Sequence, residues 1–123
     1  MDDRQATLRE KLERLLSEVA EVEVALSRAE GAIVGLPHYS VIESRAHELG
    51  RQLSRTVQQR QMGESAAAAG PRARCPGCGT VCQLQQKKRS VTSIDGPVDL
   101  AELQGRCPSC RRDFFPSAGD IGV

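Results

Sequence analysis

The sequence predicts an α+β fold, in which an N-terminal two-helix hairpin or coiled coil precedes a small β module. Apolar residues recur at heptad spacing over residues 8–33, which is typical of an amphipathic helix. Two segments rich in Val, Thr, Ile and Leu follow in the second half, which is typical of strands. Two Cys-x-x-Cys turns enclose those segments, so a hairpin would carry the second turn back onto the first.

The first helix is predicted by a strict heptad pattern. One core position holds Leu12, Val19, Leu26 and Ile33, and the other holds Leu8, Leu15, Val22 and Ala29. Most charged residues of this segment fall outside the narrow apolar seam, as in coiled coils. The seam indicates either a homodimer through residues 8–33 or a helix that packs on its own chain, because the length barely reaches the useful minimum.

A second helix is predicted after the turn at Gly35 and Pro37. Ser40 and Glu43 form a capping box, and an apolar stripe then continues to a point before Gly63. Beyond it the composition shifts, although four alanines could prolong the helix before Gly70-Pro71 stops it. We therefore expect a helical hairpin or coiled-coil region over residues 4–62, a linker over 63–74, the β module over 75–116 and a disordered tail over 117–123.

The β module is expected to be a hairpin. Its predicted strands are Lys87–Ile94 and Val98–Gln104, joined by a turn at Asp95-Gly96-Pro97. Only Tyr39, Phe114 and Phe115 are aromatic in the 123 residues, so the module has little material for an apolar core.

Four cysteines at the two ends of this hairpin are the candidate metal ligands: Cys75, Cys78, Cys107 and Cys110. A two-residue gap lets both sulfurs of a turn point the same way, and two such turns supply the four thiolates that tetrahedral zinc takes at about 2.3 Å. Four protein ligands close the site, so one Zn²⁺ would be structural and would contribute on the order of 10 kcal/mol to folding. A redox dithiol or a pair of disulfides is the alternative.

Three further candidate ligands are weaker. Cys82 lies four residues after Cys78 and could compete for the metal, but the matched Cys-Pro-x-Cys turns are the better half-sites. His38 and His47 lie far from any cysteine in sequence, so we expect surface roles for both.

Charge is unevenly distributed along the chain. Residues 1–70 hold nine basic and eleven acidic side chains, whereas residues 72–112 hold eight basic and three acidic ones. This asymmetry favours a phosphate-facing β module, although a solvated surface would explain it as well. The candidate DNA contacts are Lys87, Lys88, Arg89, Arg106, Arg111 and Arg112.

Three motifs make most of residues 40–116 resemble a known family. They are Cys75-Pro76-x-Cys78-Gly79, Asp95-Gly96-Pro97-Val98, and the run from Arg106-Cys107-Pro108 through Cys110-Arg111-Arg112-Asp113 to Phe114-Phe115-Pro116. They resemble the N-terminal region of bacterial insertion-sequence transposases of the ISKra and ISLre type. The resemblance implies a zinc-ribbon region that recognises the ends of a mobile element. In that family an integrase-like catalytic domain with three acidic residues on metal ions normally follows.

The sequence therefore predicts a zinc-dependent DNA-binding region of a transposase-like protein, either truncated or one piece of a longer product. We expect no enzymatic activity from these residues, because they show no phosphate loop, no nucleophile with a base and no acidic metal-binding set. The rival interpretation is a protein-interaction or transcription-associated zinc ribbon, and a decayed fragment is a third. We expect a cytoplasmic protein, because neither a long apolar run nor an N-terminal signal segment is present. The resemblance further implies a bacterial protein that is associated with the nucleoid when bound to DNA.

Overall fold

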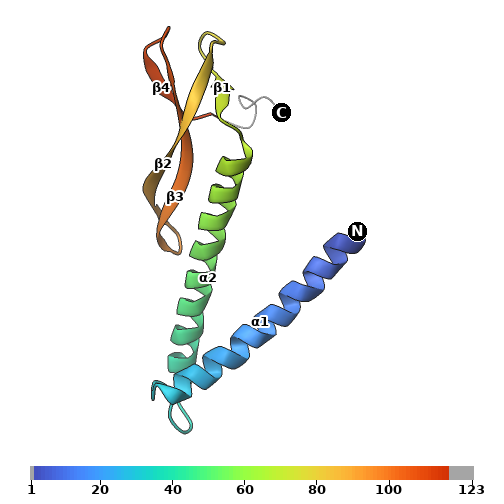
Figure 1. Ribbon diagram of the computed structural model, residues 1–123. Helices are drawn as coiled ribbons and strands as arrows, with labels where there is room; N and C mark the ends of the chain where they lie inside the picture. The colour runs from blue at the N-terminus through green and yellow to red at the C-terminus, as the bar shows by residue number, and fades with distance from the viewer. Residues whose placement is uncertain (1, 117–123) are drawn as a thin grey trace. The chain divides into compact units, whose positions relative to one another are not determined.

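The computed structural model describes residues 2–116, in which two helices precede four strands (Figure 1). Their bounds are α1 Asp3–Ala29, α2 Tyr39–Ala68, β1 Arg72–Arg74, β2 Val81–Ser93, β3 Gly96–Cys107 and β4 Arg112–Phe114. This confirms the α+β class. Two compact units, Met1–Ala46 and His47–Val123, divide inside α2, so the second half of that helix belongs with the sheet. The tail predicted over residues 117–123 lies outside the described residues.

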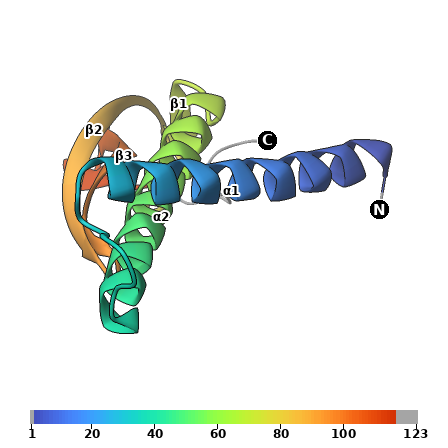
Figure 2. The ribbon, with the colours of Figure 1, turned by 90° about the horizontal axis from the view of Figure 1, so that it is seen from below.

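Helix α1 runs uninterrupted over 27 residues (Figure 2). Asp2 caps its N-terminus, because the carboxylate accepts the backbone N–H of Gln5 at 2.7 Å. The helix ends at Ala29, so Ile33 is not a member of the heptad seam as predicted. Ile33 instead lies in the following turn, where it is buried and its N–H donates to the carbonyl of Ser27 at 3.1 Å.

Helix α2 begins at Tyr39, two residues earlier than the predicted capping box at Ser40 implies. His38 is the capping residue, because its Nδ1 accepts the backbone N–H of Ser40 at 3.1 Å and its carbonyl accepts that of Val41. Within the first unit, Arg45 on this first part of α2 bonds to Glu23 and Glu30 of the segment before it.

Of the linker predicted over residues 63–74, residues 69–71 lie outside a helix or strand. The prolongation of the second helix by the four alanines, which the sequence left open, is present. Helix α2 continues through Gly63 to Ala68, because the alanines that follow are the best helix formers and outweigh the roughly 1 kcal/mol that one glycine costs. The last three residues of the predicted linker form β1, which pairs with Val81–Gln83.

The sheet is antiparallel with strand order β1-β2-β3-β4. Its central hairpin is longer than predicted, since Ser93 pairs with Gly96 and Leu84 with Gly105 at the two ends of the register. The turn is Ile94-Asp95, not Asp95-Gly96-Pro97. Gly96 has φ +107°, which suits the position after a tight two-residue turn, and Pro97 is already paired with Thr92.

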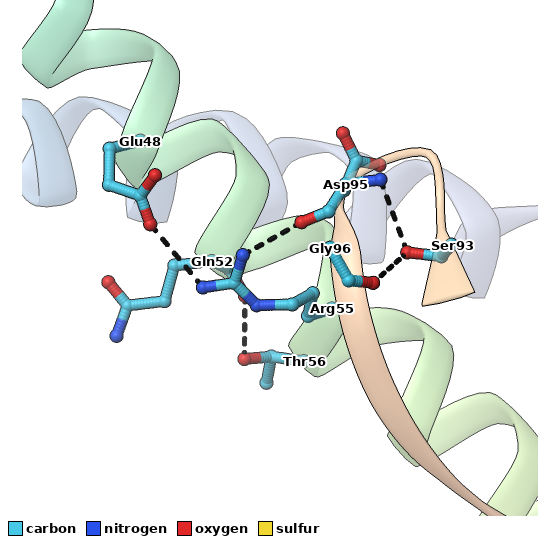
Figure 3. A network of polar contacts seen from close by, with 7 residues as sticks. All are labelled: Glu48, Gln52, Arg55, Thr56, Ser93, Asp95 and Gly96. Atoms are coloured by element: carbon cyan, nitrogen blue, oxygen red, sulfur yellow. Dashed lines mark hydrogen bonds and ion pairs between the residues drawn. The ribbon is translucent and has the colours of Figure 1, made fainter. Parts of the chain in front are cut away.

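Polar contacts join the tip of this hairpin to α2 within the second unit (Figure 3). The guanidinium of Arg55 donates to the carbonyl of Asp95 at 2.8 Å and pairs with Glu48 at 3.4 Å. The hydroxyl of Ser54 donates to the Asp95 carboxylate at 2.5 Å. Further along, the side-chain oxygen of Gln59 accepts the backbone N–H of Asp99 on β3. The helix thereby satisfies polar groups that the hairpin tip and the edge of β3 would otherwise leave to water.

The apolar core of the sheet lies at the opposite end, around the cysteines. It consists of Ala73, Cys75, Cys82, Cys107 and Phe114, with Leu84 and Cys110 packed against it. The ring of Phe114 lies directly over Gly105 on the neighbouring strand, so that a Cβ at residue 105 would be 2.5 Å from the ring. This core is too small to stabilise a sheet by burial alone. Among the described helices, none is long and apolar enough to cross a membrane.

Candidate metal centre

Two cysteine turns meet at one end of the sheet because of its antiparallel topology. The first turn follows Arg74 at the end of β1 and leads into β2, and the second joins β3 to β4. Since β1 pairs with β2 and β4 pairs with β3, both connections lie at the same end of the central hairpin. The four cysteines that the sequence predicts as ligands are therefore brought together.

The four sulfur atoms form a compact cluster. Those of Cys75, Cys78, Cys107 and Cys110 all lie within 4.8 Å of one another. The Sγ–Sγ distance is 3.8 Å between Cys75 and Cys110 and 3.5 Å between Cys78 and Cys107. A tetrahedral ion with metal–sulfur bonds of about 2.3 Å requires sulfur atoms about 3.8 Å apart. The cluster thus matches a closed tetrahedral site, which leaves no position open for a substrate.

The two turns close with the same backbone hydrogen bond. Gly79 donates to the carbonyl of Cys75, and Arg111 donates to that of Cys107. The amides that reach the sulfurs differ: Gly77, two residues after Cys75, donates to its Sγ at 3.4 Å, whereas Cys110, three residues after Cys107, donates to its Sγ at 3.3 Å. In both turns an amide disperses thiolate charge.

The two turns differ in the residue that follows the second cysteine. That residue has a left-handed backbone in both, with φ +79° at Gly79 and +56° at Arg111. Glycine adopts this conformation freely, whereas a side chain there costs roughly 1–2 kcal/mol. Arg111 is the one described residue other than glycine with a positive φ, so the second turn retains strain that the first one lacks.

The thiols of the cluster do not ionise alike. The pKa of Cys107 is lowered to about 6, chiefly because the backbone N–H of Cys110 donates to its sulfur. The pKa of Cys110 is raised to about 12, chiefly because its sulfur lies beside those of Cys78 and Cys75. Four neighbouring thiolates repel one another, and a divalent cation bound between them removes this conflict.

Cys82 belongs to the apolar core that packs beside the four-cysteine cluster. Its side chain is 4% exposed and its thiol donates to the carbonyl of Thr80 at 3.3 Å. Burial is the main reason that the pKa of Cys82 is raised, so it remains a neutral thiol packed against the site. Neither Cys82 nor the two histidines belong to the group of four within the described residues.

The register separates the six basic residues that the sequence predicts as DNA contacts. Successive side chains of a strand point to opposite faces of a sheet, and residues directly opposite each other share a face. Lys87 and Arg89 therefore share one face with Arg106, while Lys88 and Arg112 lie on the other with the buried Cys82 and Phe114. Arg111 lies in the turn between β3 and β4.

Two of these arginines are paired with acids. Arg89 contacts Glu102 at 2.6 Å, and Arg106 contacts Asp113 at 3.2 Å. Both arginine side chains are at least 60% exposed, so the pairs are weak and would yield to a competing anion.

Arg72 and Arg74 belong to the same surface, although neither is among the DNA contacts that the sequence predicts. The predicted linker includes both, but β1 pairs Arg72 with Gln83 and Arg74 with Val81, which places both on the face of Lys87. Both are exposed, and the buried Ala73 lies between them on the other face. The alternation of polar, apolar and polar residues at 72–74 is too short to identify a strand, so the sequence offers no usable signal for these two contacts.

No family model matches the chain, and neither a curated protein nor a solved structure shows significant similarity to it. The fold and the sulfur cluster are therefore the observations from which a function has to be argued.

Serine substitutions test the ligand assignment. The purified chain should contain one equivalent of zinc, and Cys107→Ser should lower it to substoichiometric levels and unfold the sheet, because metal binding contributes much of the folding free energy. Cys82→Ser is the matched control and should retain the metal. Elemental analysis with circular dichroism measures both, and an equal loss from Cys82→Ser would contradict the assignment.

The left-handed backbone at Arg111 and Gly79 predicts opposite changes in stability for substitutions at these two matched positions. Arg111→Gly should raise the stability of the metal-loaded protein by up to about 1 kcal/mol, because glycine relieves the left-handed backbone. Gly79→Ala should lower it by about 1 kcal/mol for the same reason. Thermal unfolding of both variants measures this, and destabilisation by Arg111→Gly would show that the arginine side chain itself supports the fold.

Proposed function

We propose that this chain is a zinc-dependent DNA-binding region that recognises the ends of a mobile element, as part of a transposase-like protein. The sulfur cluster supports the choice of zinc, since four thiolates in a closed tetrahedral arrangement are typical ligands of structural zinc. The role of the zinc is to fix the strands on which the basic side chains stand.

One observation supports DNA binding most strongly. The exposed basic side chains of residues 72–112 stand on the sheet that the four cysteines close, rather than on a loose linker or on the acidic helix α1. A rigid basic surface attracts phosphate, and arginine also reaches the guanine edge with two hydrogen bonds. The strained Arg111 fits this function, because strain that a glycine would remove is often retained for the side chain.

The specific target follows from the resemblance of the second cysteine turn and Phe114-Phe115-Pro116 to transposase N-terminal regions. An element has two ends, so its recognition region would act in pairs. We assign no catalytic step to these residues, because the site we propose is closed to substrate.

Zinc dependence and salt dependence together test the proposal. The zinc-loaded chain should bind a fluorescent duplex with an affinity that falls steeply between about 50 and 200 mM salt, because binding releases counterions from the DNA. Cys107→Ser should abolish binding, while Cys82→Ser should preserve it. Anisotropy titrations measure this, with an element's terminal sequence compared against a scrambled duplex, and absent binding by the zinc-loaded chain would refute the proposal.

A second candidate function is protein interaction, and a specific feature favours it. A cavity of about 580 Å³ opens beside the end of α2, and its lining includes Met62, Ala66, Leu103 and Phe115. Phe115 is 59% exposed there, which suits an apolar side chain of a partner. A chain that retains a protein partner but binds no duplex would favour this function over the first.

We further propose that two copies associate through α1. The leucine and valine residues of the seam within the helix are all at least 42% exposed: Leu8, Leu12, Leu15, Val19, Val22 and Leu26. A heptad seam of this kind is buried by a second helix with the same pattern, and a dimer would present two DNA-binding modules to two element ends.

Sedimentation tests this association. The unaltered chain should sediment as a dimer, and Leu15→Glu with Val22→Glu should make it monomeric, because charge within a seam cannot be desolvated cheaply. Glu13→Lys on the face away from the seam is the control and should leave the dimer intact. An unaltered chain that is monomeric at high concentration would rule out self-association.

A further inference from the structure

The sheet has two chemically different faces near the metal centre. We name one the Arg72 face, formed by the exposed or half-buried side chains of Arg72, Arg74, Gln83, Gln85, Lys87, Arg89, Gln104 and Arg106. The other we name the Lys88 face, which combines Lys88 and Arg112 with the buried core residues Ala73, Cys82, Gly105 and Phe114. Positive charge is thus concentrated on one face, while the other is occupied mainly by the core.

We infer that the Arg72 face is the surface that contacts the phosphate backbone of duplex DNA, with Arg72 and Arg74 among the contacting residues. This inference rests on the proposed function. It adds the face of the sheet that contacts DNA, two contacting residues, Arg72 and Arg74, and the double-stranded form of the DNA. It also removes Lys88 and Arg112 from the predicted contacts, since they stand on the opposite side of the strands.

Charge on the Arg72 face supports this assignment. Its described strands hold five basic side chains from three neighbouring strands. The two acids on the same side of the sheet, Glu102 and Asp113, are each paired with an arginine. No acidic contact is found for Arg72, Arg74 or Lys87 in the part of the chain that the structure describes. These three side chains are therefore available to phosphate without breaking an existing ion pair.

The neutral residues of the face also suit nucleic acid. Gln83, Gln85 and Gln104 stand between the basic residues, and their amides donate hydrogen bonds to phosphate oxygens and sugars. Val81, which pairs with Arg74, also lies on this face and is 56% exposed. One valine beside eight polar residues does not form the apolar patch of a hydrophobic protein interface.

The absence of aromatic residues from this face favours a duplex over a single strand. Proteins that bind single-stranded nucleic acid without sequence preference stack the bases on aromatic side chains. None of the eight residues of the Arg72 face is aromatic, and Phe114 is buried on the opposite side. The face therefore offers phosphate contacts without a stacking platform, as recognition of paired bases requires.

Two double variants with the same change in net charge test the inference. Arg72→Gln with Arg74→Gln removes two charges from the Arg72 face, and Lys88→Gln with Arg112→Gln removes two from the Lys88 face. The first should weaken binding to a short fluorescent duplex about tenfold and flatten the salt slope by up to about two units. The second should change the affinity by no more than about twofold. Zinc content and circular dichroism of both variants verify that the sheet remains folded.

Each other outcome has a definite meaning. Equal losses of duplex affinity in the two variants would show that net charge alone matters. A loss of affinity confined to the Lys88 variant would place the contact on the opposite face. Either result overturns the inference, although the proposed DNA binding itself would stand. An unaltered zinc-loaded chain that binds no duplex refutes the proposed function, and the inference with it. Competition by single-stranded DNA as strong as that by the duplex would contradict the assignment of a duplex ligand.

Discussion

The second unit depends on the cluster of four cysteine sulfurs at one end of the long β2–β3 hairpin. The apolar core beside them has one aromatic ring and few large side chains, and two of its five buried members are themselves candidate ligands. Burial on this scale does not offset the conformational entropy of ordering four strands. A metal ion bound by the four cysteines would supply the difference, so that the sheet and the basic residues on it would form together with the centre.

A second set of contacts acts at the other end of the hairpin, where core residues are scarce. Arg55 and Ser54 of α2 hold Asp95 at the hairpin tip, while Gln59 satisfies an edge amide of β3. Polar contacts with α2 thus hold the tip of the hairpin, and the cysteine cluster holds its other end. A surface held at both ends keeps its side chains in fixed relative positions, which suits the DNA contact that we propose.

Much of this arrangement follows from local sequence rules, and the exceptions have physical causes. The two Cys-Pro-x-Cys turns predict the sulfur cluster because turn spacing fixes where the sulfurs point. The linker predicted over residues 63–74 is shorter in the structure, since a single Gly63 does not outweigh the alanines after it and a three-residue strand such as β1 has almost no pattern of its own. For the same reason Arg72 and Arg74 are not among the predicted contacts, because only pairing with β2 gives them a face. Lys87 and Lys88 point to opposite faces of the sheet because of the strand register, which composition and charge counts do not predict.

X-ray absorption spectroscopy at the zinc edge of the metal-loaded protein tests the central claim most directly, because it measures the ligands of the ion itself. The structure predicts four sulfur atoms at about 2.3 Å and no lighter atom in the first shell. A nitrogen or oxygen ligand at about 2.0–2.1 Å, or fewer than four sulfurs, would contradict a closed four-cysteine centre. That result would also remove the physical basis on which the basic surface is held in place.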